Sequence, residues 1–186
     1  MPNKLLIKDA ILALPSGPSR ADVLCDGRRI VAIERDLESD GAAVLNARGL
    51  TLGPGFVDIH VHGGGGHSFF TRDPRAVTAY AEWAPENGVT SFLVSTVGPN
   101  AGATETILEN LAAAVGGTAP GAEMLGFHLE GPFLSPQRRG AFHPDMLREA
   151  GREEFLRYQE AAGGHIRQVT FAPELSHALA LAARSP

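Results

Sequence analysis

Two histidines separated by a single residue, His60 and His62, are the feature of this 186-residue sequence best suited to chemistry. They lie in the segment PGFVDIHVHGGGG, whose continuous apolar run is typical of a buried parallel strand. Alternate residues of a strand point to the same side, so the two imidazoles are expected to converge. Imidazole is the commonest metal ligand in proteins, which makes the pair a candidate half of a metal site. For the bare motif, two strand histidines satisfied by hydrogen bonds remain the alternative.

A carboxylate, Glu130, ends another apolar segment in the stretch GFHLEGPF. If it points inward, it offers a hard oxygen ligand that complements the histidines, whereas an ordinary charged residue at a strand-to-loop junction is the alternative. His128 falls on the same face, and we expect it to be a buried hydrogen-bonded partner rather than a ligand. Asp58 shares the face of His60 and His62 and is expected to orient one imidazole.

From about residue 53 onward, the segments that carry these residues alternate between strand and helix patterns. Four strand-helix units in series predict right-handed crossovers and a parallel sheet. Barrels of this type place their active sites at the carboxyl ends of the strands, where the candidate ligands fall. Four units are half of a (β/α)₈ barrel, and an autonomous four-stranded α/β domain is the alternative. We predict strands at 55–63, 89–98, 123–133 and 166–174, and helices at 74–88, 103–115, 145–164 and from 176.

The first 52 residues have a different pattern of short apolar runs broken by turn residues. Asp26 and Gly27 form a hairpin signal between two such runs. This region is predicted to form a small, mostly antiparallel sheet.

Composition excludes several classes of function. The net charge is −5, and nothing in the spacing of the 16 basic residues makes a basic patch, so neither nucleic acid nor a membrane surface is an expected partner. No apolar run approaches the length of a membrane span. Cys25 is the single cysteine, which excludes an intrachain disulfide and a cysteine-based zinc cluster and favours the cytoplasm.

The stretches PGFVDIHVHGGGG and GFHLEGPFLSPQRRGAFHP resemble the amidohydrolase superfamily and, within it, the N-acetylglucosamine-6-phosphate deacetylase family. VTFAPE and DGRRIVAIE also match the family pattern. The resemblance covers essentially all of the chain and about the first half of a family member. It implies an α/β fold: the first half of a (β/α)₈ TIM-like barrel at 53–186, preceded by part of a small β-sandwich domain at 1–52.

The resemblance also implies roles for individual residues. Glu130 matches the principal metal ligand of the family, and His60 and His62 match positions that hold a second metal in some members. One or two divalent ions are therefore expected, with Zn²⁺, Fe²⁺, Co²⁺ and Mn²⁺ all compatible with these ligands.

Two further positions are implied to contact an amino-sugar phosphate. Ala141 matches a residue that contacts the sugar largely through its backbone. Phe142 stands where members often have His or Gln, which weakens the same role for His143, one place later.

The reaction implied is metal-dependent hydrolysis of the acetamide of N-acetylglucosamine 6-phosphate to glucosamine 6-phosphate and acetate, by an enzyme expected to be a homodimer. The family places two further histidine ligands and the catalytic aspartate at positions that would follow Pro186, so no catalytic residue is assigned here and the isolated chain is expected to be inactive. The alternatives are another amidohydrolase, similar to dihydroorotases, aminoacylases or deaminases, and a non-catalytic half-barrel that pairs with a partner chain.

The remaining candidates have weaker signals. Arg138 and Arg139 have the guanidinium geometry that suits a sugar phosphate, although a solvated loop pair is the simpler interpretation. His67 follows the first predicted barrel strand closely enough to reach the site, but a surface position is the simpler expectation. His165 and His177 are expected to lie outside the site, His165 because it precedes the fourth strand.

Overall fold

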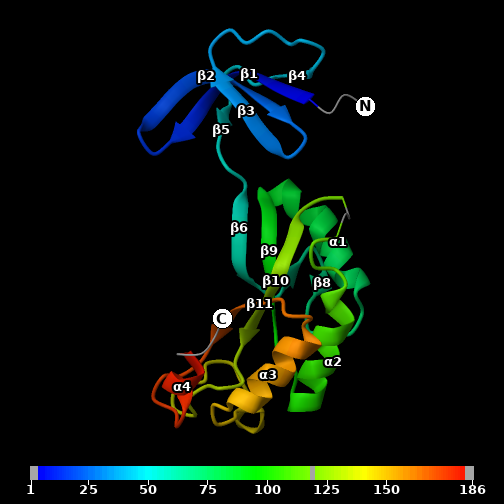
Figure 1. The fold of residues 1–186 in the computed structure, drawn as a ribbon, viewed down its shortest axis with the longest axis vertical. Helices are drawn as coiled ribbons and strands as arrows, with labels where there is room; N and C mark the ends of the chain where they lie inside the picture. The colour runs from blue at the N-terminus through cyan, green and yellow to red at the C-terminus, as the bar shows by residue number, and fades with distance from the viewer. Residues whose placement is uncertain (1–3, 118–119, 183–186) are drawn as a thin grey trace. The chain divides into compact units, whose positions relative to one another are not determined.

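A computed structural model describes residues 4–117 and 120–182 of the chain. The chain divides into two compact units, residues 1–54 and 55–186 (Figure 1). None of the described helices has both the length and the apolar character that crossing a membrane requires.

The first unit contains one sheet, with strands in the order β3-β2-β1-β4 and with β5 also paired to β1. The predicted hairpin at Gly27 is confirmed, because β2 and β3 pair in antiparallel fashion on either side of it. The prediction of a mostly antiparallel sheet holds for β1, β2 and β3, whereas β4 and β5 run parallel to β1. The strands are β1 (Lys4–Leu14), β2 (Gly17–Asp26), β3 (Arg29–Glu34), β4 (Ala43–Asn46) and β5 (Thr51–Leu52).

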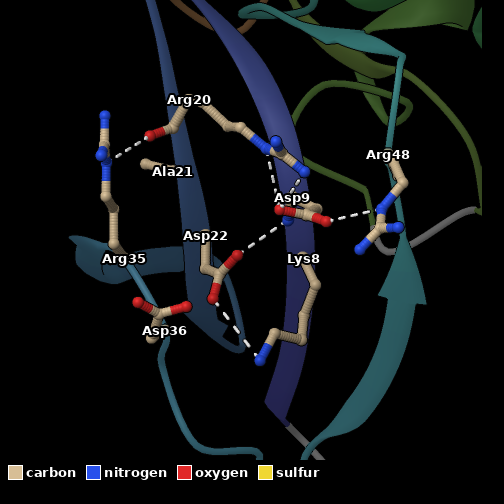
Figure 2. Close-up of a pocket in the computed structure, with 8 residues that line it drawn as sticks. All are labelled: Lys8, Asp9, Arg20, Ala21, Asp22, Arg35, Asp36 and Arg48. Atoms are coloured by element: carbon tan, nitrogen blue, oxygen red, sulfur yellow. Dashed lines mark hydrogen bonds and ion pairs between the residues drawn. The ribbon is translucent and has the colours of Figure 1, made fainter.

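A bulge in β1 is held by two aspartates (Figure 2). Asp9 adopts a left-handed backbone conformation with φ 67°, and its N–H donates to the carboxylate of Asp22, which is buried, at 2.7 Å. The Asp9 carboxylate accepts hydrogen bonds from Arg20 and Arg48. These guanidinium groups, Arg20 first and Arg48 second, lower the pKa of Asp9 below its usual range. The pocket drawn in Figure 2 is therefore lined by charges that largely neutralise each other.

The second unit contains a curled sheet of four parallel strands, which is half of a barrel (Figure 1). The strand order is β11-β10-β9-β6, as expected for consecutive right-handed units. The predicted parallel sheet is confirmed. Its strands are β6 (Phe56–Val61), β9 (Val89–Thr96), β10 (Glu123–Glu130) and β11 (Ile166–Thr170).

Helices connect these strands and cover one face of the sheet. Asn100 caps the second helix by accepting a hydrogen bond from the N–H of Ala103 at 2.9 Å, and Gly88 ends the first helical segment with φ 79°. Residues 183–186, where the last predicted helix would continue, lie outside the described residues. The helices are α1 (Arg75–Trp83), η1 (Ala84–Asn87), α2 (Ala101–Ala112), α3 (Arg152–Ala161) and α4 (Ala178–Ala182).

The third helix begins later than the sequence predicted, at residue 152 rather than 145. A single 3₁₀ turn, η2 (Pro144–Met146), forms first and ends because Leu147 is extended, with ψ 145°. The backbone N–H of Arg148 then bonds to the carbonyl of Pro132 at 3.0 Å, which folds the chain back on the start of the loop. The segment 131–151 is therefore mainly a long loop at the carboxyl end of β10. Loops at that end of barrel strands are the ones that build active sites.

A short hairpin follows β6, formed by β7 (Gly63–Gly64) and β8 (His67–Ser68). Gly63 has φ 118°, and a Cβ there would lie 2.0 Å from the carbonyl oxygen of His67. Only glycine therefore fits directly after His62, where the chain turns sharply into the hairpin.

The core of this unit lies between the sheet and its helices. Phe69 is fully buried there, and its ring contacts Tyr80 and Phe92 with centroid distances of 5.0 and 5.9 Å. Its backbone N–H donates to the carbonyl of His62 at 2.9 Å, so Phe69 fixes the loop after β6 to the core.

We expect the substitution Phe69→Ala to lower the free energy of unfolding by about 3–5 kcal/mol, because it leaves a cavity in the core. The neighbouring Phe70→Ala is the matched control, since Phe70 is 53% exposed and its loss should cost less than about 1 kcal/mol. Urea denaturation followed by circular dichroism measures both. Equal losses for the two variants would show that Phe69 does not hold the core in this way.

Candidate metal centre

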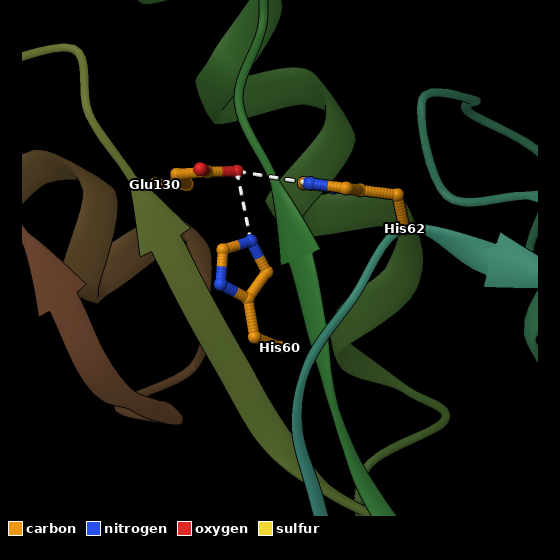
Figure 3. A group of neighbouring side chains, drawn as sticks. All are labelled: His60, His62 and Glu130. Carbon is orange, nitrogen blue, oxygen red and sulfur yellow. Dashed lines mark ion pairs between the residues drawn. The ribbon is translucent and has the colours of Figure 1, made fainter. Parts of the chain in front are cut away.

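Three side chains converge at the carboxyl ends of two strands (Figure 3). His60 lies in β6, His62 follows that strand, and Glu130 is the last residue of β10. The Nε2 atoms of His60 and His62 lie 3.3 and 3.0 Å from Oε2 of Glu130. One ligand atom from each of the three residues lies within 4.8 Å of the others. The candidate ligands from the sequence are therefore brought together in space.

The orientation of the His62 ring is set by the neighbouring strand β9. Its Nδ1 lies 3.0 Å from the backbone carbonyl oxygen of Ser95. A carbonyl oxygen only accepts hydrogen bonds, so Nδ1 carries the proton. In the neutral ring, the lone pair of Nε2 then faces the Glu130 oxygen. Two acceptors that face each other are favourable only when a cation or an added proton lies between them. Metal-ligating histidines have this geometry: one ring nitrogen donates to a carbonyl oxygen, and the other faces the metal.

His60 is oriented by aromatic contacts rather than by the carboxylate expected to orient one imidazole. Its ring meets the edges of His62 and His128 with centroid distances of 5.2 and 4.7 Å. The carboxylate of Asp58 instead accepts a hydrogen bond from the backbone N–H of His60 at 3.1 Å. The prediction that Asp58 binds an imidazole is therefore wrong, because the backbone amide two residues away lies within reach of its short side chain.

His128 is a buried, hydrogen-bonded histidine, as the sequence predicted. Its Nδ1 lies 2.9 Å from Oγ of Ser95 and its Nε2 lies 2.8 Å from Oγ1 of Thr170. Burial lowers its pKa below the ordinary value of 6.5, and the nearby His60 lowers it further. Both ring nitrogens are engaged, so His128 supports the centre without offering it a ligand atom.

A cavity of about 530 Å³ adjoins two of the three side chains, His62 and Glu130. Ala141 lines it, as do Arg138 and Arg139. His143 is not among its lining residues, and the Nδ1 of His143 instead lies 3.4 Å from both the N–H and the carboxylate of Asp145. The other lining residues are His62, Phe70, Glu130, Leu134, Gly140, Phe142, Met146 and Thr170.

Among the described residues, the remaining histidines do not belong to the group of His60, His62 and Glu130. His67 lies exposed in β8 and does not line the cavity. His165 directly precedes β11, at the opposite end of the sheet from Glu130, and His177 precedes α4.

Three residues that shape the site, Phe70, Ser95 and Thr170, carry no signal in the sequence that sets them apart. Phe70 stacks on the His62 ring at a centroid distance of 5.0 Å. Ser95 and Thr170 lie at the carboxyl ends of β9 and β11, so the same rule that selected Glu130 applies to them. They were overlooked because hydroxyl residues are common at strand ends.

The pKa of His128 predicts a pH-dependent stability. Because the pKa of His128 is lowered in the folded chain, the ring stays neutral to a lower pH there than in the unfolded chain, which takes up a proton below about pH 6.5. The stability gained from neutral His128 is therefore fully present above that pH and decreases as the pH falls below it. We expect the stability difference between wild type and His128→Asn, measured by urea denaturation in EDTA, to shrink between about pH 7.5 and 5.5. A constant difference would contradict this assignment.

The known proteins that this chain resembles are deacetylases of amino-sugar phosphates. The chain is 36% identical over 180 residues to N-acetylglucosamine-6-phosphate deacetylase of Bacillus subtilis, covering 94% of this chain and 46% of that protein. It is 34% identical over 128 residues to N-acetylgalactosamine-6-phosphate deacetylase of Escherichia coli O157:H7, covering 69% of this chain and 34% of that protein. No protein-family model matches the chain.

A solved structure shows the same fold. It is a variant of N-acetyl-D-glucosamine-6-phosphate deacetylase from Mycobacterium smegmatis in complex with N-acetyl-D-glucosamine-6-phosphate, with a TM-score of 0.82 at 30% identity. The match covers 96% of this chain and 46% of that one. The chain thus spans about half the length of the proteins it matches, consistent with their N-terminal half. With these sequence and structural matches, the chain belongs to the N-acetylglucosamine-6-phosphate deacetylase family.

Proposed function

We propose that this chain forms part of a metal-dependent hydrolase that cleaves the acetamide of N-acetylglucosamine 6-phosphate to glucosamine 6-phosphate and acetate. The observation that carries the proposal is the convergence of His60, His62 and Glu130 beside a cavity. The reaction itself comes from the names of the matched relatives.

The three donors fit a divalent cation. The Nε2 lone pair of His62 faces a Glu130 oxygen at 3.0 Å, and His60 brings a second imidazole nitrogen to the same oxygen. Nitrogen and carboxylate donors of this kind suit Zn²⁺, Fe²⁺, Co²⁺ or Mn²⁺. A bound cation would polarise an amide carbonyl and lower the pKa of a coordinated water toward about 7.

The cavity beside these donors combines cationic and apolar surfaces. Arg138 and Arg139 line it, and guanidinium groups bind phosphate with well-matched hydrogen bonds. Arg139 also donates to the carbonyl of Phe142, which holds this part of the loop against the cavity. The rings of Phe70 and Phe142 line the cavity and would exclude water from a bound acetyl group. We infer that the sugar phosphate lies between the arginines and the candidate ligands, with Ala141 beside the sugar.

Other parts of the proposal concern the whole protein. We propose a cytoplasmic homodimer whose proton-transferring aspartate and further histidine ligands belong to the half of the relatives that this chain does not match. The first unit would then form part of a β-sandwich. One face of its sheet exposes apolar residues, among them Ile30, Ile33 and Leu45 at 64%, 49% and 52%, as a sheet awaiting a second layer would.

Metal binding tests the candidate centre directly. We expect Glu130→Gln to weaken Zn²⁺ or Co²⁺ binding to the chain at least tenfold, because it removes a charged ligand, and losing even an outer contact typically costs 10–100-fold. Glu149→Gln, an exposed carboxylate in the same loop, is the matched control and should bind like wild type. Titration calorimetry and the visible spectrum of the Co²⁺ form give the measurement. Unchanged affinity in Glu130→Gln would reject the centre.

Ligand binding tests the substrate. The Zn²⁺-loaded chain should bind N-acetylglucosamine 6-phosphate at least about tenfold more tightly than N-acetylglucosamine, since charge-assisted hydrogen bonds to phosphate each contribute about 1.5–3 kcal/mol. Arg139→Gln should reduce that preference, while the exposed Arg152→Gln should not.

NMR titration measures these affinities, and acetate release followed in the same samples should be negligible. No preference for the phosphorylated sugar would contradict the proposed substrate. Rapid, metal-dependent release of acetate would contradict the proposal that the aspartate lies outside this chain.

A further inference from the structure

A line of hydrogen bonds crosses three strands of the half-barrel beneath the candidate ligands. It runs from β9 through β10 to β11, by way of Ser95, His128 and Thr170. Ser95 and His128 are fully buried, and Thr170 lines the cavity. None of the three side chains supplies an atom to the group of His60, His62 and Glu130, so this line of polar groups offers no ligand to the proposed metal centre.

A backbone amide at one end of this line determines which group donates in each hydrogen bond. The N–H of Val61 lies 3.1 Å from Oγ of Ser95 and can only donate to it. The hydroxyl hydrogen of Ser95 then needs an acceptor of its own, because a buried donor without a partner is costly. Within the described residues, the acceptor that this hydroxyl contacts is Nδ1 of His128, at 2.9 Å.

The next steps follow from the chemistry of a neutral imidazole. A ring that accepts at Nδ1 carries its single proton on Nε2. The Nε2 of His128 lies 2.8 Å from Oγ1 of Thr170, so it donates to that oxygen. The Thr170 hydroxyl thereby accepts from His128, and its own hydrogen is free to point elsewhere. Thr170 lines the cavity with Glu130 and His62, so its hydroxyl lies where a molecule in the cavity would accept this hydrogen.

We propose that the Val61–Ser95–His128–Thr170 chain runs in this single direction and presents the Thr170 hydroxyl as a hydrogen-bond donor to an oxygen atom of the ligand in the cavity. The ligand class rests on the proposed function, in which the oxygen belongs to the acetamide or a hydroxyl of an acetylated amino-sugar phosphate. The direction of the hydrogen bonds does not depend on that function.

Ser95 has a second part in the same arrangement, as a positioning residue. Its carbonyl oxygen holds the Nδ1 proton of His62, while its hydroxyl binds the amide of Val61, the residue between the two histidines. One serine thus orients the His62 ring through its backbone and His128 through its side chain. His62 and His128 should therefore have opposite tautomers, with the proton on Nδ1 in His62 and on Nε2 in His128.

The tautomers are measured directly by long-range ¹H–¹⁵N correlation spectra of histidine-labelled chain. The sample is free of metal and held at about pH 8, above the ordinary histidine pKa. Signals are assigned with the single variants His62→Asn and His128→Asn, and the exposed His67 provides a reference for an unconstrained ring. We expect the Nε2–H tautomer for His128 and the Nδ1–H tautomer for His62. An Nδ1–H tautomer of His128 would reverse the direction of the hydrogen bonds. The Thr170 hydroxyl would then donate to His128, and the proposal would be overturned.

Variants separate a directed chain from simple packing. Ser95→Ala removes the donor to Nδ1 and should leave His128 with a mixture of tautomers, while the conservative Ser95→Thr should restore the Nε2–H form. Thr106→Val is the matched control, because Thr106 donates to the carbonyl of Gly102 in α2. It should leave both tautomers unchanged. If Ser95→Ala keeps a pure Nε2–H form, Ser95 does not set the direction and the proposal fails.

The donor role of Thr170 is measured with N-acetylglucosamine 6-phosphate as the probe. Thr170→Val should weaken its binding to the Zn²⁺-loaded chain about threefold to tenfold, the usual effect of one hydrogen bond, and Thr170→Ser should bind like wild type. Equal binding by wild type and Thr170→Val would overturn the donor role. If wild type itself does not bind the probe while the tautomers are as stated, the proposed function fails, but the proposed direction of the hydrogen bonds is retained.

Discussion

The hydrogen bond between His62 and the carbonyl of Ser95 is the interaction on which the candidate centre depends. Because a carbonyl cannot donate, this contact selects one tautomer and turns the other ring nitrogen toward Glu130. Without it, the imidazole could rotate or place its hydrogen on Nε2 and bind the carboxylate as a simple hydrogen-bond donor. His62 therefore owes its orientation toward Glu130 to a residue that contributes no atom to the group.

Parallel strand pairing makes that contact possible. β6 and β10 each pair with β9, so their carboxyl ends reach the same edge of the sheet. Side chains that are distant in sequence, such as His62 and Glu130, then meet across the central strand at hydrogen-bond distance. The same pairing aligns Ser95 with His128 and allows His128 to reach Thr170. The polar groups of the site and those beneath it follow from one topology.

The loop after β10 gives the site its cavity. It remains a loop because Leu147 is extended and Arg148 bonds back to Pro132, which delays the helix to residue 152. This leaves Arg138, Arg139 and Ala141 beside the candidate ligands. The relatives share the fold over this region, and the chain spans about half their length. The cavity observed here is accordingly formed by the part of the family fold that the chain contains.

The sequence by itself was sufficient for the parallel sheet, the hairpin at Gly27 and the choice of His60, His62 and Glu130, because periodicity and strand-end position are local properties. It also placed His128 correctly as a buried partner, on the same strand face as Glu130. The role of Asp58 was decided by a local hydrogen bond from the backbone amide of His60. The start of the third helix and the contributions of Phe70, Ser95 and Thr170 were decided by tertiary structure. These features depend on contacts between residues that are separated in the chain. They include the tautomer of His62, the stacking of Phe70 on its ring and the return of the loop at Arg148 to Pro132. No local pattern records which of those groups will meet.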